Sequence, residues 1–301
     1  MNISELIPDI YKLVQRKDNW FTDDLAGEYA AGLSKRLQGQ LSPIKRKATL
    51  RLSGMGPRCP RALWYSIHHP DLAEPMPPWA EIKYSYGHMI EALAIVLAKA
   101  AGHEVVGEQD ALSLDGIVGH RDCVIDGCVV DVKSCSSRSF QKFKSPAYDQ
   151  IDGFGYLDQL DGYVVASNDD PLVKVKDKGY ILAIDKTVGR MLLYEHPIRE
   201  ASIRDRIKQY KGIVAGDQPP RCECKTEAYG ASGNIRLDTR ASYSAYKYCC
   251  FPTLRAFAYA EGPQYLTKVV RKPDVPEIFR RRNSPTGIIS EDVGQHSDIS
   301  S

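Results

Sequence analysis

Apolar positions recur with helical spacing in three stretches of the first hundred residues. They predict helices over residues 6–14, around residues 25–37 and over residues 82–101. Gly102 directly follows the last of these stretches and is a typical helix stop. The first 50 residues contain no candidate catalytic residue, so we interpret them as a helical N-terminal extension.

The middle of the chain alternates between strand-like and helix-like patterns. Strands are predicted over residues 104–108, 118–125, 128–135, 180–185 and 191–195, with one helix that contains Gln159 and Tyr163 and another over 198–215. This alternation is typical of an α/β fold with a mixed central sheet. We expect the main domain to span residues 51–265. Residues 266–301, increasingly rich in Pro, Ser, Asp and Arg, are expected to form a flexible tail.

The amino-acid composition limits the size of the core and the net charge but does not indicate a function. The 301 residues, of which 43% are hydrophobic, can bury one substantial core with a smaller appended unit. Forty Lys+Arg against 38 Asp+Glu give a net charge of only +2, so any attraction for phosphate must come from local groups of basic residues. These groups are Lys142/Lys144, Lys174/Lys176/Lys178 and Arg280/Arg281/Arg282.

Targeting signals are absent from the printed residues. No run approaches the roughly 18 apolar residues that a membrane span requires, and the first residues lack the apolar block of a secretory signal. We therefore expect a cytoplasmic protein without a membrane partner. In that compartment its eight cysteines are expected to be thiols or metal ligands rather than disulfides.

The segment GHRDCVIDGCVVDVKSC predicts a tight β-hairpin. Asp126-Gly127 lies between two β-rich runs, and this pair is typical of a two-residue turn with positive φ values. With these two residues in the turn, Ile125 faces Cys128. One face of the hairpin is then apolar and is expected to pack beneath a helix through Cys123, Ile125, Cys128, Val130 and Val132.

The same register places Asp122 opposite Asp131, and His120 opposite Lys133, all on the other face. Directly opposed side chains have Cβ atoms about 4.5 to 5.5 Å apart, where two carboxylates repel each other. A hard divalent cation with oxygen ligands removes that repulsion and can activate water for phosphodiester hydrolysis. The alternative is an ordinary surface ion pair between Lys133 and Asp131, which is common for an isolated D-x-K.

These motifs together resemble the PD-(D/E)XK nuclease superfamily, in particular its RecB-like and lambda-exonuclease-like branches. Four motifs occur in the family order over roughly residues 55 to 251. In YGHMIEALAIVLAKAAGH, Gly87 is followed four residues later by Glu91, the position of a metal-facing acid in the family. His88 lies at the wrong offset to be that ligand.

The next two motifs are the G-x-x-D of Gly119 to Asp122 and the D-x-K of Asp131 to Lys133. The resemblance implies that Asp122 and Asp131 bind metal, that the main-chain carbonyl of Val132 is a further ligand, and that Lys133 is catalytic. The fourth motif, QLDGY, is similar to the Q-x-x-x-Y of RecB-like exonucleases. It implies that Gln159 and Tyr163 face the site and the DNA from one side of a helix.

The resemblance implies a three-layer nuclease core, followed by a helical C-terminal cap. The expected function is a Mg²⁺- or Mn²⁺-dependent DNA exonuclease of recombination, repair or phage DNA metabolism, acting in a bacterial or phage-infected cytoplasm. Its substrate would be single- or double-stranded DNA with an end, and a homo-oligomer or a recombination partner protein is possible. The alternatives are a structure- or sequence-specific endonuclease and a non-catalytic DNA-binding factor on the same fold.

Relatives in this family often hold an iron–sulfur cluster with one cysteine before the core and three after it. Cys59 and Cys250 match the first and last of these positions, but Ala241 and Ser244 stand at the other two. We favour a lost cluster whose structural role has passed to packing of Trp64, Tyr246 and Phe251. The alternative is that the missing ligands for an iron–sulfur cluster or Zn²⁺ come from elsewhere, namely from Cys222 and Cys224. Against it, C-x-C followed by a gap of 24 residues before Cys249 is poor ligand spacing.

Overall fold

The structure is a computed structural model that describes residues 1–41 and 48–278. Contacts divide the chain into two compact units, one of residues 1–57 and 77–209 and the other of residues 58–76 and from 210 onward. Each unit combines two segments that are distant in the sequence. The predicted tail therefore starts within described structure, while Arg280/Arg281/Arg282 lie outside the described residues.

The first unit contains a five-stranded mixed sheet in the order β1-β4-β5-β6-β7, in which only β5 and β6 run parallel. A separate two-stranded sheet pairs β2 with β3. The strands are β1 (Val105–Val106), β2 (Ala111–Leu114), β3 (Ile117–His120), β4 (Cys123–Ile125), β5 (Cys128–Cys135), β6 (Lys178–Asp185) and β7 (Met191–Pro197). The prediction of an α/β fold with a mixed sheet is confirmed.

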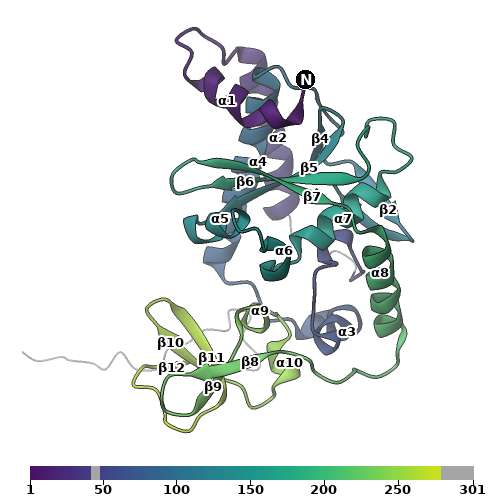
Figure 1. Ribbon diagram of the computed structural model, residues 1–301. Coiled ribbons are helices and arrows are strands. Elements are labelled where there is room, and N and C mark those ends of the chain that lie inside the picture. Colours follow the sequence, from purple (N-terminus) through teal and green to yellow (C-terminus); the bar gives the residue numbers. More distant parts are fainter. Residues whose placement is uncertain (42–47, 279–301) are drawn as a thin grey trace, which may run out of the picture. The chain divides into compact units, whose positions relative to one another are not determined.

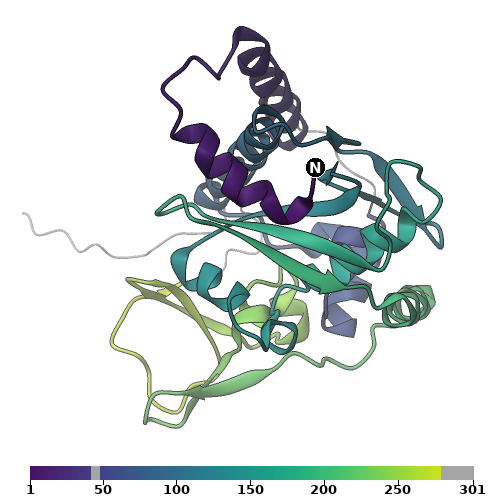
Figure 2. The ribbon, with the colours of Figure 1, turned by 45° about the horizontal axis from the view of Figure 1, so that its top comes forward.

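Helices lie on both sides of this sheet, with α1 and α4 on one side and α5 and α7 on the other (Figures 1 and 2). The helical elements of the first unit are η1 (Ile3–Glu5), α1 (Leu6–Val14), α2 (Asp23–Leu41), η2 (Leu52–Gly54), α4 (Pro78–Ala100), α5 (Ser137–Phe143), α6 (Tyr148–Ile151), α7 (Tyr156–Ala166) and most of α8 (Glu200–Ala215). None of the described helices combines the length and the apolar character needed to cross a lipid bilayer.

A hydrophobic core fills the space between the sheet and the pair α1 and α4. The even-numbered residues of β5 and β6 enter it because side chains alternate along a strand, and Leu6, Ile10 and Ala98 meet them from the helices. The predicted apolar face of the hairpin is confirmed, since all five of its residues belong to this cluster: Cys123, Ile125, Cys128, Val130 and Val132. The odd-numbered residues of β5 consequently face α7, on the opposite side of the sheet.

The second unit contains a five-stranded antiparallel sheet, where the sequence predicted a helical cap. Its elements are α3 (Pro60–His68), η3 (Pro70–Leu72), the end of α8, β8 (Thr226–Tyr229), β9 (Asn234–Leu237), α9 (Thr239–Ser242), α10 (Lys247–Cys250), β10 (Arg255–Tyr259), β11 (Gly262–Lys268) and β12 (Glu277–Ile278). The cap prediction is corrected because hairpins of short strands form most of this region. Strand β11 extends into residues 266–278, and strand β12 lies within them, although we expected these residues in the tail.

Candidate active site

The hairpin of β4 and β5 has the predicted register. Asp126 and Gly127 form its turn with φ values of 50° and 78°, and Ile125 pairs with Cys128. Asp122 lies one residue before β4, and its Oδ2 accepts a hydrogen bond from the backbone N–H of Val132 at 2.8 Å. Because β5 is the central strand of its sheet, the hairpin does not form an edge of that sheet.

The predicted pairing of His120 with Lys133 is wrong. His120 lies in β3, where it is exposed and pairs with Ala111 of β2. The chain leaves the main sheet before Asp122, because the buried side chain of Arg121 forms ion pairs with Asp110 and Asp170 at 2.7 and 2.6 Å. A buried guanidinium with two carboxylate partners holds this segment away from β5.

Glu91 reaches the same region from α4. Its side chain is largely buried, and its Oε1 accepts a hydrogen bond from Arg36 Nε at 3.0 Å. His88, one turn earlier on α4, has its Nδ1 at 3.8 Å from Glu91 Oε2. Arg36 belongs to α2, in the N-terminal extension where the sequence analysis found no chemistry, so the extension contributes a side chain to the site.

Gln109 links Glu91 to Asp122 and was missed by the sequence analysis. Its Nε2 lies 2.7 Å from Glu91 Oε1 and 3.4 Å from Asp122 Oδ1, so one amide group donates toward two carboxylates. Its backbone N–H also donates to the carbonyl of Asp122 at 3.1 Å. Gln109 has a φ of 57°, a conformation that costs energy for a residue other than glycine and that tends to occur at functional sites.

Asp131 and Lys133 project from β5 toward α7. Asp131 is fully buried, and its Oδ2 lies 2.7 Å from Lys133 Nζ. Its Oδ1 accepts a hydrogen bond from Gln159 Nε2 at 3.1 Å, and the same amide donates to the hydroxyl of Tyr163 at 3.0 Å. The ammonium of Lys133 also lies 5.0 Å from the centre of the Tyr156 ring.

Excess negative charge gathers around Asp122. Burial raises the pKa of Asp122 well above its usual value, and the charges of Asp131 and Glu91 raise it further. Burial also raises the pKa of Asp131, although Lys133 acts in the opposite direction. The charged group of Lys133 offsets part of the charge of these two carboxylates, but the ionised pair remains unfavourable without further positive charge.

Lys133 and Glu91 keep their charges. Burial lowers the pKa of Lys133, but Asp131 and Asp122 raise it by more, so the pKa lies above its ordinary value. Burial raises the pKa of Glu91, but contacts with His88 and Arg36 lower it by more, and the net direction is downward. At neutral pH Lys133 is therefore a cation and Glu91 an anion.

The donor set suits a hard divalent cation. Carboxylates converge here from α4, from the residue before β4 and from β5, and oxygen ligands of this kind are those that Mg²⁺ and Mn²⁺ prefer. Asp131 Oδ2 is buried, and its ion-pair partner is the ammonium of Lys133 at 2.7 Å. A metal ion beside Asp122 and Asp131 would add the further positive charge that two buried carboxylates need.

The glycine of the G-x-x-D motif has a steric role. A Cβ on Gly119 would lie 2.7 Å from Leu52 Cβ and 2.9 Å from Tyr163 Cε1. We predict that Gly119→Ala lowers the free energy of unfolding by about 1 to 3 kcal/mol in urea denaturation, because the core has no room for the added methyl group. Gly27→Ala, on α2 with nothing within 4 Å of its added Cβ, is the control and is expected to cause no loss. Equal stability of the two variants would contradict the steric argument.

Gln109 is expected to position two metal ligands. Groups that orient ligating carboxylates typically change metal affinity by 10- to 100-fold when they are removed, so we predict that Gln109→Ala weakens Mn²⁺ binding by about 10-fold or more. Isothermal titration calorimetry checks this, with Gln150→Ala on the exposed side of α6 as the matched control. Wild-type affinity in both variants would show that Gln109 does not act on the ligands.

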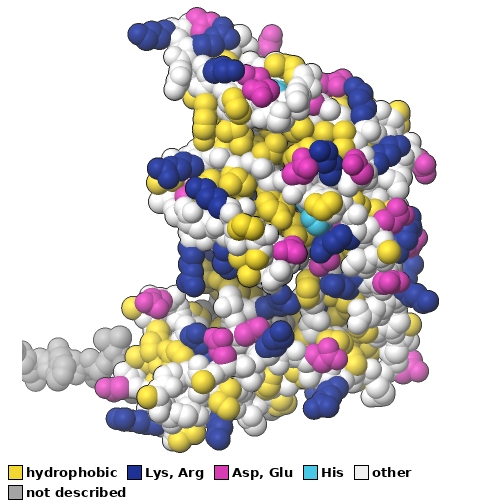
Figure 3. All heavy atoms as spheres, in the orientation of Figure 1, with side chains coloured by type: hydrophobic (Ala, Val, Ile, Leu, Met, Phe, Trp, Pro, Cys, Tyr) yellow, Lys and Arg dark blue, Asp and Glu magenta, His cyan; other side chains and the backbone are white. Residues whose placement is uncertain are grey.

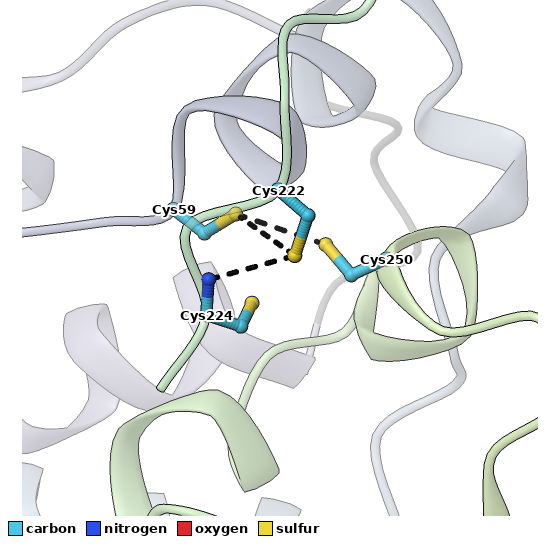
Figure 4. Close-up of side chains that lie close together, drawn as sticks. All are labelled: Cys59, Cys222, Cys224 and Cys250. Atoms are coloured by element: carbon cyan, nitrogen blue, oxygen red, sulfur yellow. Dashed lines mark hydrogen bonds between the residues drawn. The ribbon is translucent and has the colours of Figure 1, made fainter. Parts of the chain in front are cut away.

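Four cysteines of the second unit lie close together. Cys59 precedes α3, Cys222 and Cys224 precede β8, and Cys250 ends α10. Their sulfurs all lie within 4.8 Å of one another and point toward a common centre (Figure 4). These are the four cysteines that the sequence analysis named as possible ligands.

The structure contains both the four gathered cysteines and the aromatic packing that we expected to take over the role of a lost cluster. Trp64 stacks on His68 and donates to the carbonyl of Gly216 at 2.7 Å, and Phe251 packs beside Leu254. The preference for a lost cluster rested on sequence spacing, which does not fix spacing in the folded chain. The prediction is corrected in that respect, because the four thiols are gathered in one place.

The distribution of basic side chains bears on where phosphate could bind. On the face drawn in Figure 3, Lys and Arg are interspersed with Asp and Glu. Of the basic groups named from the sequence, Lys174 and Lys178 pair with Glu104 and Glu195. Lys142 and Lys144 are both exposed, and both lie at the C-terminal end of α5, the helix that follows β5.

No protein-family model and no curated protein matches this chain. Among solved structures, it is similar to SSO0001, with 19% identity over 73% of this chain and 95% of that one, at a TM-score of 0.40. A phage-related exonuclease from Haemophilus somnus 129PT shares 12% identity, covers 68% of this chain and 89% of its own, and gives a TM-score of 0.32. An alkaline exonuclease from Laribacter hongkongensis shares 12% identity, covers 38% of this chain and 57% of its own, and gives a TM-score of 0.29. Similarities this distant establish neither a family nor an activity.

Proposed function

We propose that this protein is a Mg²⁺- or Mn²⁺-dependent deoxyribonuclease that degrades DNA from an end. One observation carries the proposal: Glu91, Asp122 and Asp131 converge from separate elements beside the cationic Lys133. Such an arrangement is expensive to maintain for stability alone, because buried like charges oppose folding. Carboxylates beside a cation can hold a divalent ion that assists phosphodiester hydrolysis, which supports the proposal.

In this proposal Glu91, Asp122 and Asp131 hold the metal, together with the main-chain carbonyl of Val132. The metal, when bound, polarises the scissile phosphate and lowers the pKa of an attacking water. Gln109 keeps the carboxylates of Glu91 and Asp122 turned toward each other by donating toward both.

Lys133 acts as a cation rather than as a base. Its raised pKa keeps the ammonium protonated at neutral pH, so it can orient the attacking water and offset charge that develops on the phosphate. Tyr163 is buried, so its part in strand binding is to hold the amide of Gln159 at 3.0 Å from its hydroxyl. Gln159 in turn contacts Asp131 and positions the strand next to the metal.

The finer assignments form part of the same proposal. The mixed sheet with helices on both faces would be the three-layer core of a PD-(D/E)XK nuclease, as the four sequence motifs imply. The biological setting would be recombination, repair or phage DNA metabolism in a bacterial or phage-infected cytoplasm.

Digestion of end-labelled linear DNA and of a closed circular plasmid tests the activity. With Mn²⁺ or Mg²⁺ the linear substrate is expected to be shortened progressively, the circle to stay intact, and both to survive in EDTA. Cleavage of the circle would instead assign a structure- or sequence-specific endonuclease. If neither substrate is cut under any metal condition, the protein is a non-catalytic DNA-binding factor and the proposal fails.

A further inference from the structure

The sulfur–sulfur distances in the cysteine cluster distinguish a single metal ion from an iron–sulfur cluster. The cluster consists of Cys59, Cys222, Cys224 and Cys250. Cys59 Sγ lies 3.8 Å from Cys222 Sγ and 3.8 Å from Cys250 Sγ, and no pair of ligand atoms in the cluster is more than 4.8 Å apart. All four sulfurs thus surround a space of the size of one ion (Figure 4).

The two sulfur–sulfur distances of 3.8 Å match those expected around a single tetrahedral zinc ion. With zinc–sulfur bonds of about 2.3 Å, the sulfurs of a regular tetrahedron lie about 3.8 Å apart. In an iron–sulfur cluster the thiolates are divided among several irons with sulfides between them, so the four sulfurs cannot all be this close. We infer that this chain holds one structural Zn²⁺ in its cysteine cluster, in place of the iron–sulfur cluster that the family resemblance implies.

The surroundings of the sulfurs favour thiolates. The backbone N–H of Glu223 donates to Cys59 Sγ at 3.3 Å, and that of Cys224 donates to Cys222 Sγ at 3.5 Å. Hydrogen bonds from the main chain to ligand sulfur fix its orientation and stabilise its negative charge.

The site is closed, which assigns it a structural role. Four protein ligands complete a tetrahedron and leave no position for water or substrate. The ligands come from three segments of the second unit and lie beside a small apolar cluster, in which Cys224 packs near Leu237 and Leu254. A metal that joins separate segments contributes directly to folding free energy where the apolar core is small.

Metal analysis of the full-length protein, produced in medium that supplies both zinc and iron, tests the inference. We expect about one zinc per chain, almost no iron or acid-labile sulfide, and no visible iron–sulfur absorption. Titration with an organomercurial reagent should release the zinc as four thiols react, which the absorbance of a zinc-binding dye reports. About one iron per chain without sulfide, iron and sulfide in cluster amounts, or a folded protein without bound metal would each overturn the inference.

Substitution localises the metal. Cys224→Ser is expected to lower zinc content to below about one tenth of the wild-type value and to lower the melting temperature. The control is Cys249→Ser, next to ligand Cys250 but outside the cluster, which should retain its zinc. Full zinc content in Cys224→Ser would contradict the site. All of these readouts are independent of DNA cleavage, so failure here leaves the proposed nuclease function untouched.

Discussion

Replacing Asp131 by asparagine is expected to reduce DNA cleavage at least about 10³-fold while leaving the fold intact, because a metal ion contributes several kcal/mol of charge stabilisation to phosphodiester hydrolysis. Asparagine keeps the shape of the side chain, and its single amide oxygen can still accept a hydrogen bond at one of the two positions that Gln159 and Lys133 contact in Asp131. The negative charge that binds the metal is lost. The rate of degradation of linear DNA in Mn²⁺, measured with the melting temperature in EDTA, checks both halves of the prediction.

The matched control is Asp149→Asn, on the exposed side of α6. It removes one carboxylate from the same unit and should keep the wild-type rate. If Asp131→Asn degrades DNA as fast as wild type, Asp131 has no catalytic role. If the melting temperature of Asp131→Asn is far below that of wild type, its loss of activity does not test the catalytic role. Asp122→Asn then becomes the test, because it removes a charge from a carboxyl whose pKa is raised by burial and by Asp131.

Replacing Lys133 by methionine is expected to separate cleavage from metal binding. Cleavage should fall about 10²-fold or more, because a preorganised charge next to the scissile phosphate is lost. Mn²⁺ binding should persist, since the three carboxylates remain. Without Lys133, Asp131 and Asp122 lose the cation beside them, so Mn²⁺ should raise the melting temperature by more than it does in wild type.

Lys17→Met, exposed in the segment that follows α1, is the control for this variant and should change neither rate nor stabilisation strongly. Differential scanning fluorimetry with and without Mn²⁺ reads the stabilisation, and a time course on labelled DNA reads the rate. A Lys133→Met protein that cuts DNA at the wild-type rate would restrict Lys133 to the ion pair with Asp131. Loss of Mn²⁺ stabilisation would show that the metal lies elsewhere.

The hairpin could be predicted because its determinants are local. Asp126 and Gly127 have the positive φ values that a two-residue turn needs, and the turn fixes the register of the pairs that follow. The alternation of side chains then separates the apolar face from the face that holds Asp131. A pattern of a dozen residues therefore contained both the core face and the acidic face.

The other parts of the site depend on distant contacts. Arg36 and Glu91 are 55 residues apart, and nothing near either residue indicates that the guanidinium meets the carboxylate. Gln109 lies between short strands with an unusual φ that no local residue preference predicts. The prediction for His120 failed because it extended the hairpin register past Arg121, whose ion pairs redirect the chain.

The strands of the second unit could not be predicted from the local sequence either. Its strands are short and belong to hairpins, so apolar alternation is too brief to separate them from loops. The gap of 25 residues between Cys224 and Cys250 suggested poor ligand spacing, yet β8, β9 and α9 fill that gap and return the chain to the same place. Sequence spacing limits a metal site only when the intervening chain is extended or short.

Direct measurement of Mn²⁺ binding tests the central claim, that Glu91, Asp122 and Asp131 form a divalent-metal site. The electron paramagnetic resonance signal of free Mn²⁺ falls when the ion binds to protein. Wild-type protein is expected to remove about one or two Mn²⁺ ions per chain from solution, and Asp131→Asn to remove far less at the same concentrations. Equal loss of the signal with both proteins, or no loss with either, would contradict the account.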